Sequence, residues 1–330
     1  MEGLRPRSPR SGADRPEGSR LGRGLRPRRT RAPFRARGGR GPQRALISPG
    51  GVPPYSSLSF TGHERGSSMT SALPPAADHA LSYTLRGDGP GVVLIHGTGG
   101  SFADWNGLQD PLANGFTVLT PDPPGSGASP LPPGPLQLDR VADQIAELAA
   151  AAGLLRYAVV GASLGGAVAL RVATRHPEHV TSVVTVAGYA RPRPSLAMRL
   201  EVWAGLGEGD TAALGAFLTS ASFSDAWLAA LDPEALHEVR RYASGSSTPG
   251  AKAQLDMTRR IDVRADLPHV AAPTLVVSCT EDMFVSPVHS AELAAGIPSA
   301  RTGTLPTGHA AAIEDPLRLT VLLEEFLEQR

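Results

Sequence analysis

A serine between closely spaced glycines is the first candidate for chemistry in this chain. Ser163 lies in the stretch VVGASLGG, residues 159–166, with Gly161 and Gly165 two positions away on either side. A serine hydroxyl can attack a carbonyl carbon, but it is a weak nucleophile unless a base removes its proton. Because the chain contains 37 glycines, the five-residue pattern alone is weak evidence. A nucleophilic Ser163 therefore requires a histidine and an acid elsewhere in the chain.

His309 is the strongest candidate for that base among nine histidines. It follows the short expected strand ARTGTLPTG and precedes the helical run AAAIEDPLRLTVLLEEFLEQR, so it lies on a loop at the carboxyl end of a strand. In open α/β sheets, ligands bind at this edge. His269 and His289, in connecting segments, are weaker candidates, and the others fit surface or loop-shaping roles.

The acid that orients the histidine is expected after another strand, between the serine and the histidine. The stretch APTLVVSCTED supplies it, because Asp282 emerges from the loop beyond the strand that contains Val276 and Val277. Glu281 is a close rival at the neighbouring position. Ser286 and Pro287 then resemble a helix start, with a capping serine before a proline at the first helical position. The order of the three groups is thus serine, acid, histidine.

Short apolar strands alternate with helical segments from about Leu81 onward, which predicts a mostly parallel sheet flanked by helices. Strands are expected at 91–97, 115–122, 156–163 and 180–190, and helices at 102–112, 138–153 and 164–177. Ser163 then lies between a buried strand and a helix. A strand, a sharp glycine turn and a helix form the context in which this serine pattern is a nucleophile elbow.

Between residues 191 and 267 the alternation stops and amphipathic helical segments take over, at 194–206, 210–221, 225–243 and 250–263, which predicts an inserted helical lid. Large apolar side chains in this region could line a substrate pocket or form the core of the lid: Met198, Trp203, Phe217, Phe223 and Trp227. A lid of this length indicates a small to medium substrate with apolar parts.

With these motifs in this order, residues 78–330 resemble the α/β-hydrolase superfamily. The segments that carry the resemblance are HGTGGS, DPPGSGAS, GASLGG, PTLVVSCTED and GHAAAIEDP. The resemblance implies a triad of Ser163, Asp282 and His309, with the backbone N–H groups of Thr98 and Leu164 forming the oxyanion hole. One departure is Cys279, where the family usually has glycine three residues before the acid. Lid length and motif spacing are most similar to small bacterial esterases and enol-lactonases.

The net charge of +1 conceals an uneven distribution along the chain. Residues 1–68 contain 15 Arg and 4 acidic residues, or +11, which leaves −10 for the rest of the chain. This Arg-, Pro- and Gly-rich tail has too few apolar residues to fold and is expected to be disordered. We therefore expect a tail over 1–68, a hydrolase core over 69–190 and 268–330, and the lid over 191–267. Translation could begin at Met69.

Composition narrows the class of protein further. A single cysteine cannot form an internal disulfide, and no apolar run is long enough to span a bilayer, so a cytoplasmic location is expected. We expect no cofactor and no metal site. The negative charge of residues 69–330 disfavours nucleic acid. A small-molecule substrate is therefore the expected partner.

The chemistry expected of these residues is acyl transfer from an ester, lactone or thioester to water through an acyl-enzyme. The same three residues would also serve carbon–carbon bond hydrolysis, cofactor-free perhydrolysis or lyase chemistry. A ligand-binding protein on a hydrolase scaffold is the alternative from a different class, since a fold does not determine a function.

Overall fold

The computed structural model describes residues 81–298 and 300–329. The expected tail over residues 1–68 and the alternative start at Met69 lie outside the described residues.

A seven-stranded sheet forms the centre of the structure, in the order β1-β3-β2-β4-β5-β6-β7. Its strands are β1 (Tyr83–Arg86), β2 (Gly91–Ile95), β3 (Thr117–Pro121), β4 (Tyr157–Ala162), β5 (Val180–Val186), β6 (Thr274–Cys279) and β7 (Ala300–Leu305). All neighbours are parallel except β1, which pairs antiparallel with β3. The carboxyl ends of six strands therefore meet at one edge of the sheet.

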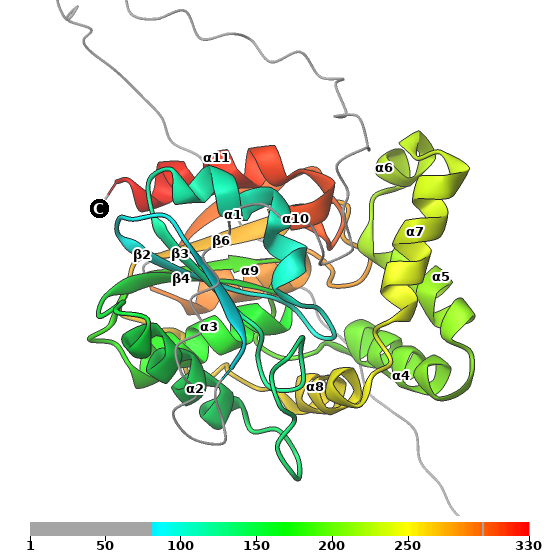
Figure 1. Cartoon of the computed structure of the whole chain (residues 1–330), viewed down its shortest axis with the longest axis horizontal. Coiled ribbons are helices and arrows are strands. Elements are labelled where there is room, and N and C mark those ends of the chain that lie inside the picture. The colour runs from blue at the N-terminus through cyan, green and yellow to red at the C-terminus, as the bar shows by residue number, and fades with distance from the viewer. Residues whose placement is uncertain (1–80, 299, 330) are drawn as a thin grey trace, which may run out of the picture. The chain divides into compact units, whose positions relative to one another are not determined.

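Helices cover both faces of this sheet (Figure 1). On one face lie α2 (Leu138–Ala151), α3 (Leu164–Arg175) and α9 (Val288–Gly296), and on the other lie α1 (Asn106–Ala113) and α11 (Pro316–Leu327). Side chains alternate between the two faces along each strand. Val93 and Ile95 of β2 therefore pack in one apolar cluster, whereas Val92 and Leu94 pack in the other. Burial on both faces accounts for the continuous apolar runs in the sequence.

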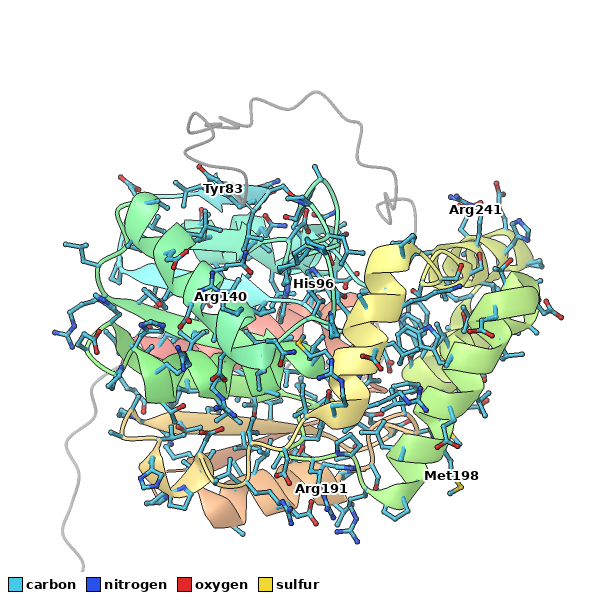
Figure 2. All side chains as sticks on the ribbon, turned by 90° about the horizontal axis from the view of Figure 1, so that it is seen from below. Tyr83, His96, Arg140, Arg191, Met198 and Arg241 are labelled. Carbon is cyan, nitrogen blue, oxygen red and sulfur yellow. The ribbon has the colours of Figure 1, made fainter. Side chains whose placement is uncertain are left out.

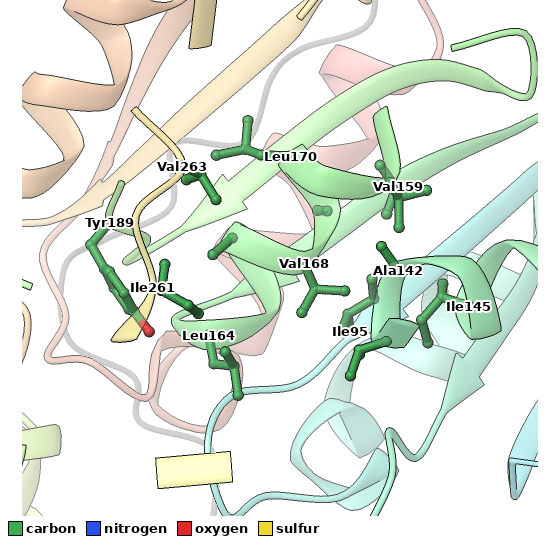
Figure 3. Packing of buried hydrophobic residues seen from close by; sticks show 14 of the residues in the cluster. Ile95, Ala142, Ile145, Val159, Leu164, Val168, Leu170, Tyr189, Ile261 and Val263 are labelled. Atoms are coloured by element: carbon green, nitrogen blue, oxygen red, sulfur yellow. The ribbon is translucent and has the colours of Figure 1, made fainter. Parts of the chain in front are cut away.

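Helices α2 and α3 pack on one face of β4, the strand that leads to Ser163. The buried positions of α2 recur with helical spacing, as Val141, Ala142, Ile145, Ala146 and Ala149. Figure 3 shows Ala142 and Ile145 of α2 next to Val168 of α3 and Val159 of β4. This packing fixes the start of α3 relative to the carboxyl end of β4.

Five α-helices are inserted between β5 and β6 and lie together beside the sheet (Figure 1). They are α4 (Pro194–Gly209), α5 (Thr211–Ser222), α6 (Asp225–Ala230), α7 (Pro233–Ser244) and α8 (Pro249–Arg260). Four of them begin at a side chain that accepts a hydrogen bond from the first turn: Asp210, Ser224, Asp232 and Thr248. Such caps satisfy N–H groups that have no partner within the helix.

Three details of the sequence-based prediction were wrong. The segment 225–243 was expected as one helical piece, but Pro233 begins a new helix, α7, after α6 has ended. The final helical run is likewise divided into α10 (Ala311–Glu314) and α11 by Pro316, because a proline has no N–H to donate within a helix and is favoured in the first turn of a new one. Helix α9 begins at Val288, with Pro287 rather than Ser286 as its capping residue. In the described part of the chain, no helix is both long and apolar enough to cross a bilayer.

The turn between β4 and α3 is too tight for side chains at its two glycines. A Cβ atom on Gly161 would lie 2.0 Å from the carbonyl oxygen of Gly165, and one on Gly165 would lie 2.1 Å from the carbonyl oxygen of Ile95. Both obstacles are backbone atoms, which cannot move aside as the end of a flexible side chain can. The two glycines are therefore required by the close approach of α3 to β2 and β4.

The variant Gly165→Ala is expected to lower the free energy of unfolding by about 3 kcal/mol or more, because the new methyl group overlaps the backbone of β2. Gly205→Ala is the matched control: Gly205 lies in α4 with open space around its Cα, so alanine is expected to stabilise the helix by about 0.5–1 kcal/mol. Denaturant unfolding of both variants measures the difference. Equal midpoints would contradict the steric argument.

Candidate active site

Ser163 occupies a strained position between β4 and α3. Its backbone angles are φ 52° and ψ −117°, in a region that residues with a side chain rarely adopt. The N–H of Ser163 donates to the carbonyl oxygen of Val186 at 3.0 Å, which ties the turn to β5. The turn presents the serine at the carboxyl edge of the sheet, and α3 begins at the next residue, Leu164.

Asp282 and His309 are brought together from two neighbouring strand ends. The Nδ1 atom of His309 lies 2.7 Å from Oδ2 of Asp282. Since a carboxylate only accepts, Nδ1–H of His309 donates and Nε2 is left as the basic nitrogen. The other oxygen of Asp282 accepts from the N–H groups of Phe284 and Val285, at 2.8 and 2.7 Å. These three bonds hold a carboxylate whose side chain is only 1% exposed.

The structure distinguishes Asp282 from Glu281, the rival position in the sequence. The side chain of Glu281 is exposed, while its backbone N–H donates to the carbonyl oxygen of Thr307 in the loop that carries His309. Cys279, at the position where the family usually has glycine, packs in the apolar cluster beneath α11. Burial raises the pKa of its thiol to about 12, so Cys279 is unreactive at neutral pH. The cysteine at position 279 therefore leaves the contact between Asp282 and His309 in place.

Glu314 of α10 holds the loop that carries His309 and links it to the inserted helices. Its carboxylate accepts from the N–H of Gly308 at 2.9 Å, and from both the N–H and the hydroxyl of Ser224 at the start of α6. The N–H of Ala310 donates to the carbonyl oxygen of Ser222 at the end of α5. The position of His309 thus depends on contacts with both α10 and the insertion.

Thr98 lies in the segment that follows β2, and this segment is tied to α8. The hydroxyl of Thr98 lies 2.7 Å from that of Thr258, and the N–H of Gly99 donates to Oε1 of Gln254 at 2.9 Å. The amide nitrogen of Gln254 in turn donates to the carbonyl oxygen of Pro124 and to Ser126. Gln254 is 1% exposed, so it is a buried connection between two loops of the core. Sequence reasoning missed it, since nothing in the helix pattern marks that glutamine.

The loop after β3 is held by Asp122. Asp122 accepts from the N–H of Phe102 and the hydroxyl of Ser82, at 2.8 and 2.9 Å. The imidazole of His96 is 2% exposed, and its Nδ1 lies 2.7 Å from the carbonyl oxygen of Gly97. These contacts shape the segment that leads to Thr98. No group of three or more His, Cys, Asp or Glu side chains within 81–298 and 300–329 is arranged to hold a metal ion.

A cavity of about 160 Å³ opens beside these groups, between the carboxyl edge of the sheet and the insertion. Ser163, His309 and Thr98 all line it. Leu164 does not, although it begins α3 next to Ser163, where an N–H of the first helical turn has no partner within the helix. The structure therefore gathers the serine, the histidine and one expected oxyanion residue on one cavity.

Only some of the expected apolar side chains of the insertion line this cavity. Trp203 and Phe223 do, whereas Trp227 stacks on Phe223 and Phe217 packs against Phe284. Met198 is 60% exposed, and Figure 2 shows its side chain at the outer surface of α4. Sequence reasoning missed Asp104, Trp105, Tyr242 and Phe284, which also line the cavity. Helical spacing alone does not reveal which face of an inserted helix meets the sheet.

The fold and the site together define an α/β hydrolase. Residues 90–316 match the sequence profile of the α/β hydrolase fold family, and the chain belongs to this family. Like the three similar proteins described next, it is a hydrolase. Its fold is the expected mostly parallel sheet flanked by helices.

Three similar proteins illustrate the range of the family. The pyrrolizixenacetamide deacetylase of Xenorhabdus hominickii is 32% identical over 253 residues, which cover 76% of this chain and 95% of that protein. The enol-lactonase of Burkholderia xenovorans LB400 is 25% identical with a TM-score of 0.69, covering 75% and 96% of the two chains. A thermophilic esterase of Thermogutta terrifontis is 26% identical with a TM-score of 0.67, covering 76% and 93%.

The variant Glu314→Gln is expected to lower the free energy of unfolding by about 1–3 kcal/mol, because an amide NH₂ would replace one of two oxygens that accept from three donors. Urea unfolding followed by circular dichroism measures this loss. Glu325→Gln, an exposed position on α11, is the control and is expected to change stability by less than about 0.5 kcal/mol. Similar stability of both variants would show that Glu314 does not hold the loop.

Proposed function

We propose that this protein is a serine hydrolase that cleaves an ester, lactone or thioester through an acyl-enzyme, with Ser163, Asp282 and His309 as its triad. The observation that carries the proposal is the Asp282–His309 hydrogen bond of 2.7 Å at the cavity that Ser163 also lines. A base held by a buried carboxylate, on the same cavity as a serine on a strained turn, is the arrangement from which a hydroxyl can be activated.

In the first half of the reaction, Nε2 of His309 removes the proton of Ser163 as its oxygen attacks the substrate carbonyl. The carbonyl π bond breaks, and its electron pair becomes the oxyanion of a tetrahedral intermediate. Asp282 keeps the Nδ1 proton in place and stabilises the imidazolium that forms. His309 then donates its new proton to the departing alcohol or thiol, which leaves the acyl group on Ser163.

In the second half, a water molecule takes the place of the alcohol. His309 removes a proton from the water as the water oxygen attacks the acyl-enzyme, and the same proton returns to Ser163 when the acid departs. In both halves the N–H groups of Thr98 and Leu164 are proposed to bind the oxyanion. Removing one such donor typically costs about 3–4 kcal/mol of transition-state stabilisation. The N-terminus of α3 adds a positive dipole at the same place.

The cavity and the relatives both support a small to medium, partly apolar substrate. A cavity of about 150 Å³ can hold a molecule the size of benzene, and the cavity here has a similar volume of about 160 Å³. Two of the similar structures are named an enol-lactonase and an esterase. Removal of an acetyl group is a second candidate reaction, since the Xenorhabdus hominickii relative is named a deacetylase.

A fluorophosphonate probe is expected to label the full-length protein once per chain, and Ser163→Ala is expected to abolish the labelling. Intact-mass spectrometry measures the added mass. Ser220→Ala, an exposed serine on α5, is the matched control and is expected to be labelled like the wild type. Equal labelling of the Ser163→Ala variant would refute the assignment of the nucleophile.

Asp282→Asn is expected to lower kcat by about 10³–10⁴-fold, because an asparagine no longer holds the imidazole in the required tautomer. Glu281→Gln is the control, since its side chain is exposed one residue away, and it is expected to remain within about threefold of the wild type. Hydrolysis of p-nitrophenyl acetate and butyrate, a lactone, a thioester and an acetanilide measures both variants and separates the two candidate reactions. A larger loss in Glu281→Gln would reverse the choice of acid.

A further inference from the structure

The cavity contains one carboxylate among aromatic walls. Of the described residues that line it, Asp104 alone has a carboxyl side chain, and none is a lysine or arginine. Aromatic side chains from the core loop, from the insertion and from the segment after Asp282 surround the space: Trp105, Trp203, Phe223, Tyr242 and Phe284. The proposed mechanism makes no use of Asp104.

The position of Asp104 depends on contacts from both the core and the insertion. Asp104 lies in the 3₁₀ helix η2 (Phe102–Trp105), and the hydroxyl of Tyr242 on α7 donates to its Oδ1. The other oxygen, Oδ2, lies over Gly100, where a Cβ atom would come within 2.0 Å of it. The carboxylate of Asp104 therefore occupies space that a side chain at position 100 would fill. Asp104 lies six residues after Thr98.

The surroundings of Asp104 disfavour its negative charge. Burial raises the pKa of Asp104, and the nearby carboxylate of Asp122 raises it further. His96 and hydrogen bonds from Tyr242 and Ser101 act in the opposite direction but do not cancel this effect. A carboxylate that is removed from water is stabilised when a positive charge is brought next to it.

We propose that Asp104, together with Tyr242 and the aromatic walls, binds a positively charged ammonium group of the substrate. A carboxylate supplies the opposite charge, and aromatic rings attract a cation through their negative faces. This inference rests on the proposed function and narrows its substrate class to esters, lactones, thioesters or amides that carry a basic or quaternary nitrogen. Asp104 is then a specificity-determining residue of the same site.

Pairs of substrates with the same shape and different charge test the proposal on the full-length protein. On the alcohol side, butyrylcholine is paired with 3,3-dimethylbutyl butyrate. On the acyl side, the p-nitrophenyl ester of 4-(trimethylammonio)butanoate is paired with that of 5,5-dimethylhexanoate. The quaternary nitrogen keeps its charge at every pH. We expect kcat/KM to favour the charged member of at least one pair by about tenfold or more.

The variant Asp104→Asn is expected to reduce this preference at least about fivefold, because it keeps the shape of the side chain and removes its charge. Asp110→Asn, at an exposed aspartate on α1, is the matched control and is expected to keep the wild-type ratio. A wild-type preference for the neutral members would overturn the proposal. Retention of the charged preference in Asp104→Asn would also overturn it, as would equal losses on both members of the pair, which indicate a structural role.

Competition in the wild-type protein provides a measurement that does not depend on the folding of a variant. Alkyltrimethylammonium ions are expected to inhibit hydrolysis of the neutral ester at concentrations about tenfold lower than the isosteric alcohols do. Equal inhibition would overturn the proposal.

The outcomes distinguish failure of the ammonium site from failure of the proposed serine-hydrolase function. If neutral esters are hydrolysed and charge has no effect, the ammonium site fails while the serine-hydrolase proposal stands. If no substrate reacts and the probe does not label Ser163, the serine-hydrolase proposal fails. Calorimetric titration with butyltrimethylammonium then still tests Asp104. Binding to the wild type that is lost in Asp104→Asn supports the ammonium site, and no binding to the wild type refutes it.

Discussion

The close contact between the backbones of β2, β4 and α3 determines where the candidate chemistry can occur. At Gly161 and Gly165 the chain approaches itself so closely that a Cβ atom would overlap a carbonyl oxygen. This contact allows the turn to hold Ser163 at a positive φ angle, which a looser connection would relax. It also aims the N-terminus of α3 at the carboxyl edge of the sheet, where the loops after β6 and β7 bring Asp282 and His309.

Around this turn, the site is completed by contacts between the core and the insertion. Gln254 of α8 holds the segment next to Thr98, and Ser222 and Ser224 hold the loop of His309 directly and through Glu314. The insertion therefore shapes the backbone of the loops that carry the proposed site as well as lining the cavity. A substitution in these helices that changes which substrate the cavity accepts is therefore expected to change the geometry of the proposed triad as well. The reason is that the same helices line the cavity and hold the loops.

Much of the core was predictable because local patterns carry the information. Strands buried on both faces appear as apolar runs, and the glycines of a tight turn can be read directly from the sequence. The sheet, the turn at Ser163 and the proposed order of serine, acid and histidine could therefore be predicted from the chain alone. The pairing of β1 with β3 was not predicted, since antiparallel pairing of an edge strand leaves no local mark. The choice between Asp282 and Glu281 also required the structure, because adjacent carboxylates differ only in the direction in which the loop turns them.

The sequence by itself therefore determined the class of fold, the family and a short list of groups that could perform acyl transfer. Only the tertiary structure decided which carboxylate meets His309, which aromatic side chains of the insertion line the cavity, and that Asp104 and Tyr242 meet there across 138 residues of chain. The physical reason is that periodicity and spacing report contacts along one element, whereas a binding cavity is made of side chains from distant elements. Their meeting depends on how the helices pack, and no local pattern encodes that arrangement.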